Sequence, residues 1–205
     1  MTDGITPDDA ERHRRKMAKR REVQQAKVAR ATREKGLLMV HTGNGKGKST
    51  AAFGLILRAV GHGLRVGLVQ FIKGTWPTGE QEALKRLYDL VDHRVMGEGF
   101  TWDTQDLERD MKAARAAWDT ALAMMADPAY GLVVLDELNV ALRYGYLPVE
   151  EAVAALEARR DGLHVLVTGR NAKPELVEAA DLVTEMTAVK HPFQAGIKAQ
   201  KGIEF

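Results

Sequence analysis

A glycine-rich stretch between two regular segments, within residues 37–54, constrains this chain most. Residues 37–40 (Leu-Leu-Met-Val) are apolar and predict a buried strand, and the alanines that follow Ser49 predict a helix. The residues between them include three glycines, whose backbone can adopt positive φ angles and turn successive N–H groups inward. A loop of this kind at a helix N-terminus predicts a binding site for phosphate groups.

The side chains of this loop strengthen the prediction. Lys48 brings a positive charge to the phosphates, and the hydroxyl of Ser49 can ligate Mg²⁺. The usual phosphate-loop pattern has glycine five residues before the Gly-Lys pair, where this chain has Thr42, so the loop is a variant. The predicted phosphate-binding residues are Gly43, Asn44, Gly45, Lys46, Gly47, Lys48 and Ser49.

The composition is that of a globular protein. The chain has 205 residues, of which 45% are hydrophobic, enough for one domain with a full core. No apolar run approaches the roughly 20 residues of a membrane span, and the N-terminus lacks the apolar segment of a signal peptide. Since the chain has no cysteine, it can form neither disulfides nor thiolate metal sites. We therefore expect a cytoplasmic protein without membrane attachment.

Positive charge is concentrated near the N-terminus. Residues 12–35 contain 11 Lys or Arg residues, whereas the chain from Gly36 onward has 19 basic and 22 acidic residues, a net charge of −3. The predicted helix of this region is capped by Asp8 or Asp9 and runs to about Lys35, with few apolar positions. Residues 1–35 are thus either a solvated tail or a mobile arm that closes over a polyanionic ligand. The acidic remainder argues against nucleic-acid binding by residues 36–205.

The rest of the chain alternates between strand and helix patterns. This alternation predicts an α/β fold with a mainly parallel central sheet and helices on both faces. In the helix at 106–125, Leu107, Met111, Trp118 and Leu122 have helical spacing and are expected to pack against the core. Strands are predicted at 65–72, 91–95, 132–135, 163–168 and 182–186, and helices at 81–88, 106–125, 150–159 and 176–180.

Charged residues follow the ends of these strands. Asp136 and Glu137 end the strand at 132–135, where a carboxylate can hold a Mg²⁺ ion near the Ser49 hydroxyl. Lys73 and Arg170 follow two other strands and can neutralise phosphate charge, because ligands of parallel sheets gather at the carboxyl ends of the strands. The sequence therefore predicts a magnesium-nucleotide site.

Two features leave the reaction open. A Gly-Lys-Ser loop with Asp-Glu suits ATP hydrolysis, in which Glu137 would polarise water, and equally suits transfer of a phosphoryl group or of another part of ATP. Phe100 and Trp102 lie in a glycine-flanked loop and either fill the core or line a pocket for a flat apolar ligand.

Five segments of the chain carry a further signal: residues 42–54, 69–77, 99–102, 133–138 and 189–193. Together they resemble one known family, the phosphate-loop type of ATP:corrinoid adenosyltransferase. The similarity extends from the basic arm to residues 198–203, with two conservative departures, Ser49 in place of threonine and Pro192 within a Lys-His segment.

The resemblance implies a RecA-like phosphate-loop fold, a homodimer and a specific reaction. Members of this family transfer the 5′-deoxyadenosyl group of ATP to Co(I) of a corrinoid and release inorganic triphosphate, with ATP reversed relative to ordinary phosphate-loop enzymes. By the same resemblance Lys48 would balance the charge of the triphosphate. Ser49 and Glu137 would ligate Mg²⁺, or Mn²⁺ as the alternative ion, with Asp136 in support.

Other parts of the site are implied in the same way. Phe100 and Trp102 match an aromatic pair that displaces the lower axial ligand of the corrinoid, and an external flavin-type reductant (flavodoxin or reduced flavin) would supply Co(I). The arm 1–35 would cover the site in the domain 36–205. Two alternatives are a phosphate-loop ATPase or small-molecule kinase, which would yield ADP, and a nucleic-acid-binding module, whose binding would weaken steeply with salt.

Overall fold

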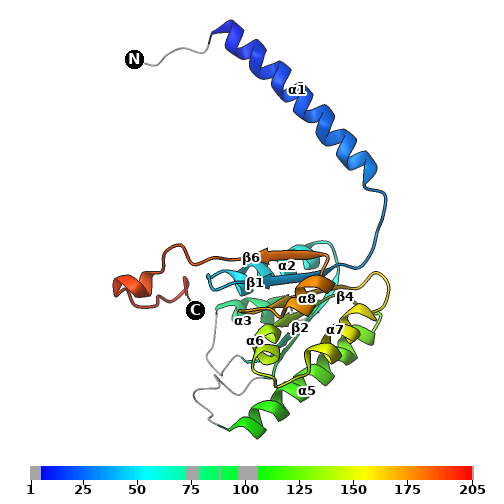
Figure 1. Ribbon diagram of the computed structural model, residues 1–205, viewed down its shortest axis with the longest axis vertical. Coiled ribbons are helices and arrows are strands. Elements are labelled where there is room, and N and C mark those ends of the chain that lie inside the picture. The colour runs from blue at the N-terminus through cyan, green and yellow to red at the C-terminus, as the bar shows by residue number, and fades with distance from the viewer. Residues whose placement is uncertain (1–5, 73–78, 88, 97–105, 205) are drawn as a thin grey trace. The chain divides into compact units, whose positions relative to one another are not determined.

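The protein forms two compact units, Met1–Glu34 and Lys35–Phe205. The computed structural model describes residues 6–72, 79–87, 89–96 and 106–204 (Figure 1). Among the described helices, none combines the length and the apolar character that a membrane span requires.

The first unit contains one long helix, α1 (Pro7–Arg30). Its N-cap is Thr6, whose hydroxyl accepts a hydrogen bond from the Asp9 backbone N–H at 3.2 Å, while the Asp9 carboxylate accepts one from the Thr6 N–H at 3.3 Å. The expectation that Asp8 or Asp9 caps the helix is therefore wrong, because Asp9 acts as the second half of a capping box. The helix also ends before the expected Lys35, at its C-cap Ala31, and the next residue is Thr32, which has a low helix propensity.

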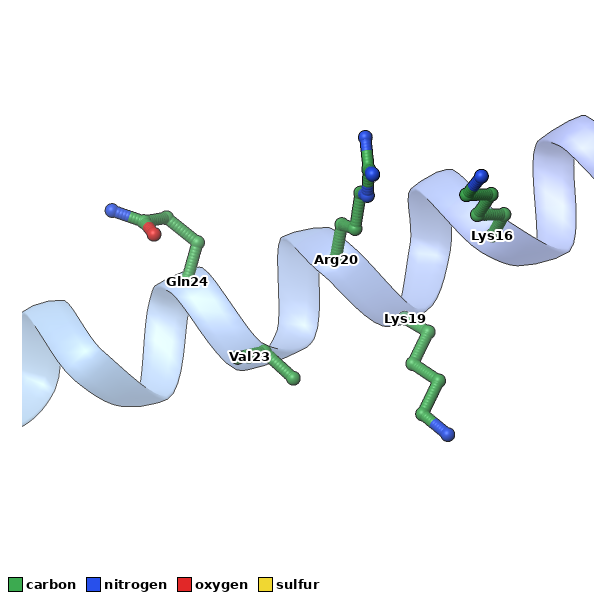
Figure 2. A pocket seen from close by; sticks show the side chains of 5 residues that line it. All are labelled: Lys16, Lys19, Arg20, Val23 and Gln24. Carbon is green, nitrogen blue, oxygen red and sulfur yellow. The ribbon is translucent and has the colours of Figure 1, made fainter.

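The surface of α1 is strongly basic. Lys16, Lys19 and Arg20 project from consecutive turns, with the half-exposed Val23 beside them (Figure 2). Near the N-terminal end, Arg12 pairs with Asp8 at 2.8 Å, a contact between exposed groups that contributes under about 1 kcal/mol. The helix thus presents cations along its length, as its sequence predicts.

The second unit is built on a six-stranded sheet in which all pairings between neighbours are parallel (Figure 1). The strand order is β3-β2-β4-β5-β1-β6, so β5 lies between β1 and β4. This arrangement confirms the expected RecA-like α/β fold. The strands are β1 (Leu38–Thr42), β2 (Arg65–Gln70), β3 (Val91–Val95), β4 (Tyr130–Asp136), β5 (His164–Thr168) and β6 (Leu182–Glu185).

Helices cover both faces of the sheet because successive strand residues point to opposite sides. Met39 and Leu166 pack with α2 (Lys48–Gly61) on one face, whereas Val40 and Val167 pack with α5 (Leu107–Ala126) on the other. The remaining helical segments are α3 (Gly79–Leu84), η1 (Lys85–Leu87), α6 (Leu138–Arg143), α7 (Val149–Glu157), α8 (Pro174–Ala179) and η2 (Pro192–Ala195). Every strand and helix expected in this unit is present to within about two residues, while α6 and η2 were not predicted.

One packing expectation for α5 is wrong. Trp118 is 1% exposed, but Leu107 and Met111 are 61% and 42% exposed, although they share its side of the helix. The buried residues of α5 begin at Ala114 and extend to Met125, so the first turns of the helix lie outside the buried contact. Helical spacing identified the correct face without showing how far along the helix the contact extends.

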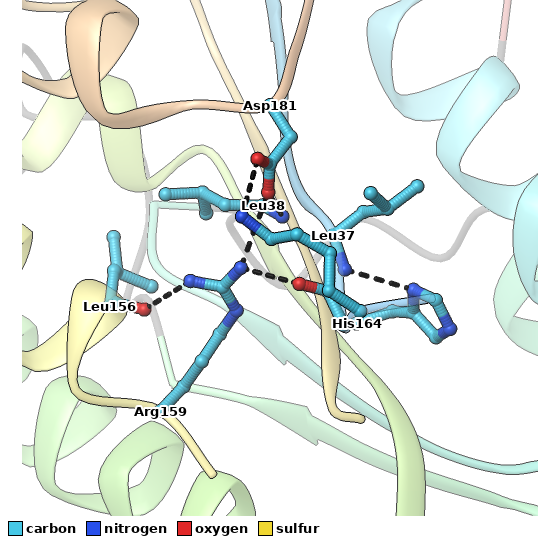
Figure 3. A network of polar contacts seen from close by, with 8 residues as sticks. Leu37, Leu38, Leu156, Arg159, His164 and Asp181 are labelled. Carbon is cyan, nitrogen blue, oxygen red and sulfur yellow. Dashed lines mark hydrogen bonds and ion pairs between the residues drawn. The ribbon is translucent and has the colours of Figure 1, made fainter. Parts of the chain in front are cut away.

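A polar network holds the segment where the second unit begins (Figure 3). Asp181 accepts hydrogen bonds from Lys35 Nζ at 2.6 Å and from the Leu38 N–H at 2.9 Å, and its pKa is lowered by these donors. Arg159 lies 3.3 Å from the same carboxylate and donates to the Gly36 carbonyl oxygen at 2.6 Å. The network therefore fixes the start of β1 against two later parts of the chain.

Candidate functional site

The loop between β1 and α2 has the backbone conformation that its glycines predict. Gly43 and Gly47 have φ angles of 94° and 108°, in the region where residues with a Cβ are strained. A Cβ at Gly43 would lie 2.4 Å from the Met186 carbonyl oxygen, and one at Gly45 would lie 2.7 Å from it. The Gly45 N–H donates to this oxygen at 2.6 Å. Glycine is thus required both for the turn and for close contact with the segment after β6.

Lys48 lies at the centre of this loop. Its side chain is buried, with 5% of the residue exposed, and Nζ donates to the carbonyl oxygens of Gly43 and Gly45 at 2.7 and 2.6 Å. Burial lowers the pKa of Lys48, against an opposing effect of Glu137 and together with the positive charge of Arg170. The predicted residues Glu137 and Arg170 therefore belong to the electrostatic surroundings of this ammonium group.

Asp136 joins three elements around the start of α2. It is 1% exposed, and its Oδ1 accepts hydrogen bonds from Ser49 Oγ at 2.9 Å and from Thr168 Oγ1 at 2.7 Å. Its Oδ2 accepts from Gln70 Nε2 at 2.7 Å. The carboxyl ends of β2, β4 and β5 thus meet at one carboxylate, next to the residue that follows Lys48.

Glu137 continues the chain in a left-handed conformation, with φ of 64°. Its N–H donates to Thr168 Oγ1 at 3.0 Å, which helps to hold this uncommon backbone geometry. A Cβ at Gly169 would come within 3.1 Å of Glu137 Oε2 and 2.9 Å of the Asn139 Cβ, so glycine gives the glutamate room. Arg170 directly follows Gly169 and is exposed.

The oxygen atoms gathered here suit a magnesium ion. Ser49, Asp136 and Glu137 offer hydroxyl and carboxylate oxygens beside the phosphate loop, and Mg²⁺ in nucleotide sites needs only one or two protein ligands besides phosphates and water. In the described parts of the chain, no cluster of three or more His, Cys, Asp or Glu side chains suited to a metal ion occurs. The donor set of Ser49, Asp136 and Glu137 therefore fits a magnesium-nucleotide site.

Two predicted residues of the loop, Asn44 and Lys46, are exposed. Lys46 points to the C-terminal segment, where it pairs with Glu204. Lys73, Phe100 and Trp102 lie outside the described residues.

Sequence reasoning missed the residues that hold Asp136. Thr168 and Gln70 are both 0% exposed and end strands that are apolar after their first residue. A polar residue at the carboxyl end of a buried strand is the signal that could have identified them. His93, which contacts Gln70 at 2.8 Å, lies within β3 and carries no such signal.

The fold and this loop define a phosphate-loop nucleotide-binding protein with a RecA-like sheet. A profile of the family described as ATP:corrinoid adenosyltransferase BtuR/CobO/CobP matches residues 34–205, and one described as Cob(I)alamin adenosyltransferase N terminal matches residues 1–28. The chain belongs to the ATP:corrinoid adenosyltransferase family, and it is thereby an enzyme of the transferase class.

Individual relatives agree with this assignment over nearly the whole chain. The chain is 55% identical over 200 residues to a corrinoid adenosyltransferase of Pseudomonas aeruginosa, covering 98% of both chains. It is 50% identical over 200 residues to one of Sinorhizobium sp, covering 97% of this chain and 93% of the relative. It is 49% identical over 195 residues to corrinoid adenosyltransferase CobA of Salmonella typhimurium, covering 95% of this chain and 98% of the relative.

Proposed function

We propose that this chain transfers the 5′-deoxyadenosyl group of ATP to the Co(I) centre of a corrinoid and releases inorganic triphosphate. The observation that carries the proposal is the family match over residues 34–205, which spans the phosphate loop and both carboxylates. In the proposed step, Co(I) supplies both electrons of the new Co–C bond, and the bond between C5′ and the triphosphate oxygen breaks. The triphosphate leaves with that electron pair.

The residues of the loop would stabilise this leaving group. Three effects support the assignment: the buried charge of Lys48, the N–H groups at the start of α2, and the charge of Arg170 near Lys48. A buried ammonium acts more strongly on a phosphate than an exposed one, because water screens it less. The reversed orientation of ATP implied by the family resemblance would bring C5′, and not the γ-phosphorus, within reach of the corrinoid.

A magnesium ion would be held by Ser49, Glu137 and Asp136, and it would neutralise charge that develops on the triphosphate. The contact of Ser49 Oγ with Asp136 at 2.9 Å supports this assignment, because Ser49 directly follows Lys48, the residue that we propose binds phosphate. Mn²⁺ prefers similar oxygen ligands and is the alternative ion.

The remaining parts of the proposal rest on the resemblance. Phe100 and Trp102 would line the lower face of the corrinoid and exclude its axial ligand, so that cobalt is reduced more easily. A flavin-type reductant would supply the electrons, and the enzyme would act as a homodimer. The N-terminal arm would close over the bound substrates, a role supported by the cations of α1 and the negative charge of ATP.

The test is an anaerobic incubation of the full chain with Mg²⁺, ATP and a chemically reduced corrinoid. The expected products are a light-sensitive cobalt–carbon species, followed by its spectrum, and one triphosphate per turnover. Formation of ADP and phosphate with an unchanged corrinoid would instead identify an ATPase or a kinase and overturn the proposal.

A further inference from the structure

A hydrogen-bonded chain leads from the predicted magnesium site to the edge of the sheet through two side chains that have no assigned role. We propose that Gln70 is a positioning residue that fixes the Asp136 carboxylate for magnesium-nucleotide binding, and that His93 fixes the amide of Gln70. The proposal rests on the proposed function in one respect, the use of Mg²⁺ with ATP.

The strand register brings these groups together. Gln70 is the last residue of β2 and lies beside Asp136 of β4, while His93 of β3 lies beside Leu68 of β2. Residues in register on parallel strands point to the same face, so Leu68, Gln70 and their partners share one side of the sheet. This is the side covered by α2, whose first turn carries Ser49.

The chemistry of the contacts sets their direction. A carboxylate only accepts hydrogen bonds, so the group of Gln70 that faces Asp136 at 2.7 Å must be its NH₂. The amide oxygen then faces His93 Nε2 at 2.8 Å, and this nitrogen must carry a proton. A reversed amide would set two acceptors against each other in a position that is 0% exposed. His93 therefore selects the orientation of Gln70 that Asp136 needs.

The consequence for the site is an oriented carboxylate. With Oδ2 held by Gln70, the other oxygen is placed to accept from Ser49 and Thr168. Hydrogen bonds behind a metal ligand commonly change metal affinity by about 10- to 100-fold. Replacing Gln70 is thus expected to weaken ATP binding in the presence of Mg²⁺ and to leave ATP binding without Mg²⁺ unchanged.

The test compares three variants of the full chain by calorimetric titration with ATP, in Mg²⁺ and in EDTA. Gln70→Met keeps the size of the side chain and removes the amide. His93→Phe removes the contact with the Gln70 amide oxygen and keeps the Gln70 side chain itself. Tyr130→Phe is the matched control, because it removes a hydrogen bond of 2.7 Å to Asp92 of β3 from Tyr130, which lies at the opposite end of β4 from Asp136. Thermal melting without ligand accompanies each titration.

Gln70→Met is expected to reduce the gain in ATP affinity from Mg²⁺ by about tenfold. His93→Phe is expected to reduce it by about threefold, and Tyr130→Phe to leave it unchanged. If Gln70→Met is too unstable to purify, His93→Phe decides the question, because it leaves the donor to Asp136 in place. Equal losses in Mg²⁺ and EDTA would overturn the inference, as would a wild-type affinity that does not depend on Mg²⁺. Since no corrinoid is present, the result does not depend on whether adenosyl transfer occurs.

Discussion

Replacing Lys48 by alanine removes the one cation that the structure buries within the phosphate loop. At an effective dielectric constant of about 20, opposite unit charges about 4 Å apart attract by about 4 kcal/mol. To reach a phosphate the ammonium gives up its hydrogen bonds to Gly43 and Gly45, each worth about 1 kcal/mol. The difference of about 2 kcal/mol corresponds to a loss of ATP affinity of roughly 30-fold.

Lys46→Ala in the same loop is the matched control. The Lys46 side chain is 49% exposed and pairs with Glu204, so water screens its charge and its removal should cost at most about fivefold in affinity. Titration calorimetry with ATP and Mg²⁺ on both variants, with a thermal melt of each, separates binding from folding. If Lys48→Ala binds ATP no more weakly than Lys46→Ala does, the loop does not hold the phosphates in the way described here.

Three further predictions concern the aromatic pair, the arm and the network at the start of β1. Trp102→Ala should slow adenosyl transfer more for a corrinoid with a lower ligand than for one without, measured by the cobalt spectrum; equal effects would mean that the residue only supports the fold. Deleting residues 1–34 should reduce turnover by about tenfold through the lost cations while the melting temperature of the remaining unit is retained, because Lys35 stays bound to Asp181; unfolding would show that the arm is structural. Asp181→Asn should lower stability by about 1–2 kcal/mol and the melting temperature by about 4 °C at neutral pH. Because the pKa of Asp181 is lowered in the folded state, this stabilisation is fully present above the unfolded-state pKa of about 3.9 and is lost as the pH falls through the lower folded-state pKa. The difference between the two melts should therefore shrink as the pH is lowered from neutral toward about 3. The control, Asp161→Asn, alters an exposed aspartate and should have little effect at either pH.

Much of the fold follows from local patterns in the sequence. Strands buried on both faces appear as continuous apolar runs, which is why β4 and β5 could be located from residues 132–135 and 163–168. Helix ends were predicted less well. Thr6 is the N-cap of α1 because it lies three residues before Asp9 and forms a capping box with it. A search for the capping-box pattern would have found Thr6 in the sequence.

The candidate site was likewise predicted only in part. The loop, Lys48, Ser49 and Asp136 were predicted because each follows or precedes a recognisable element, and the structure brings all of them together. His93 could not be assigned, since its role depends on which strands are neighbours. Strand order is a property of the whole chain, and no local pattern encodes it.

The contact between Gly45 and Met186 has a consequence for synthesis of the protein on the ribosome. The loop follows β1, but its Gly45 N–H donates at 2.6 Å to the carbonyl oxygen of Met186, which follows β6. A nascent chain therefore carries its phosphate-binding residues through most of translation before their partner has been made. Contacts between such distant residues form late and slowly in folding. We therefore expect the loop to reach the conformation described here only after residue 186 has been synthesised.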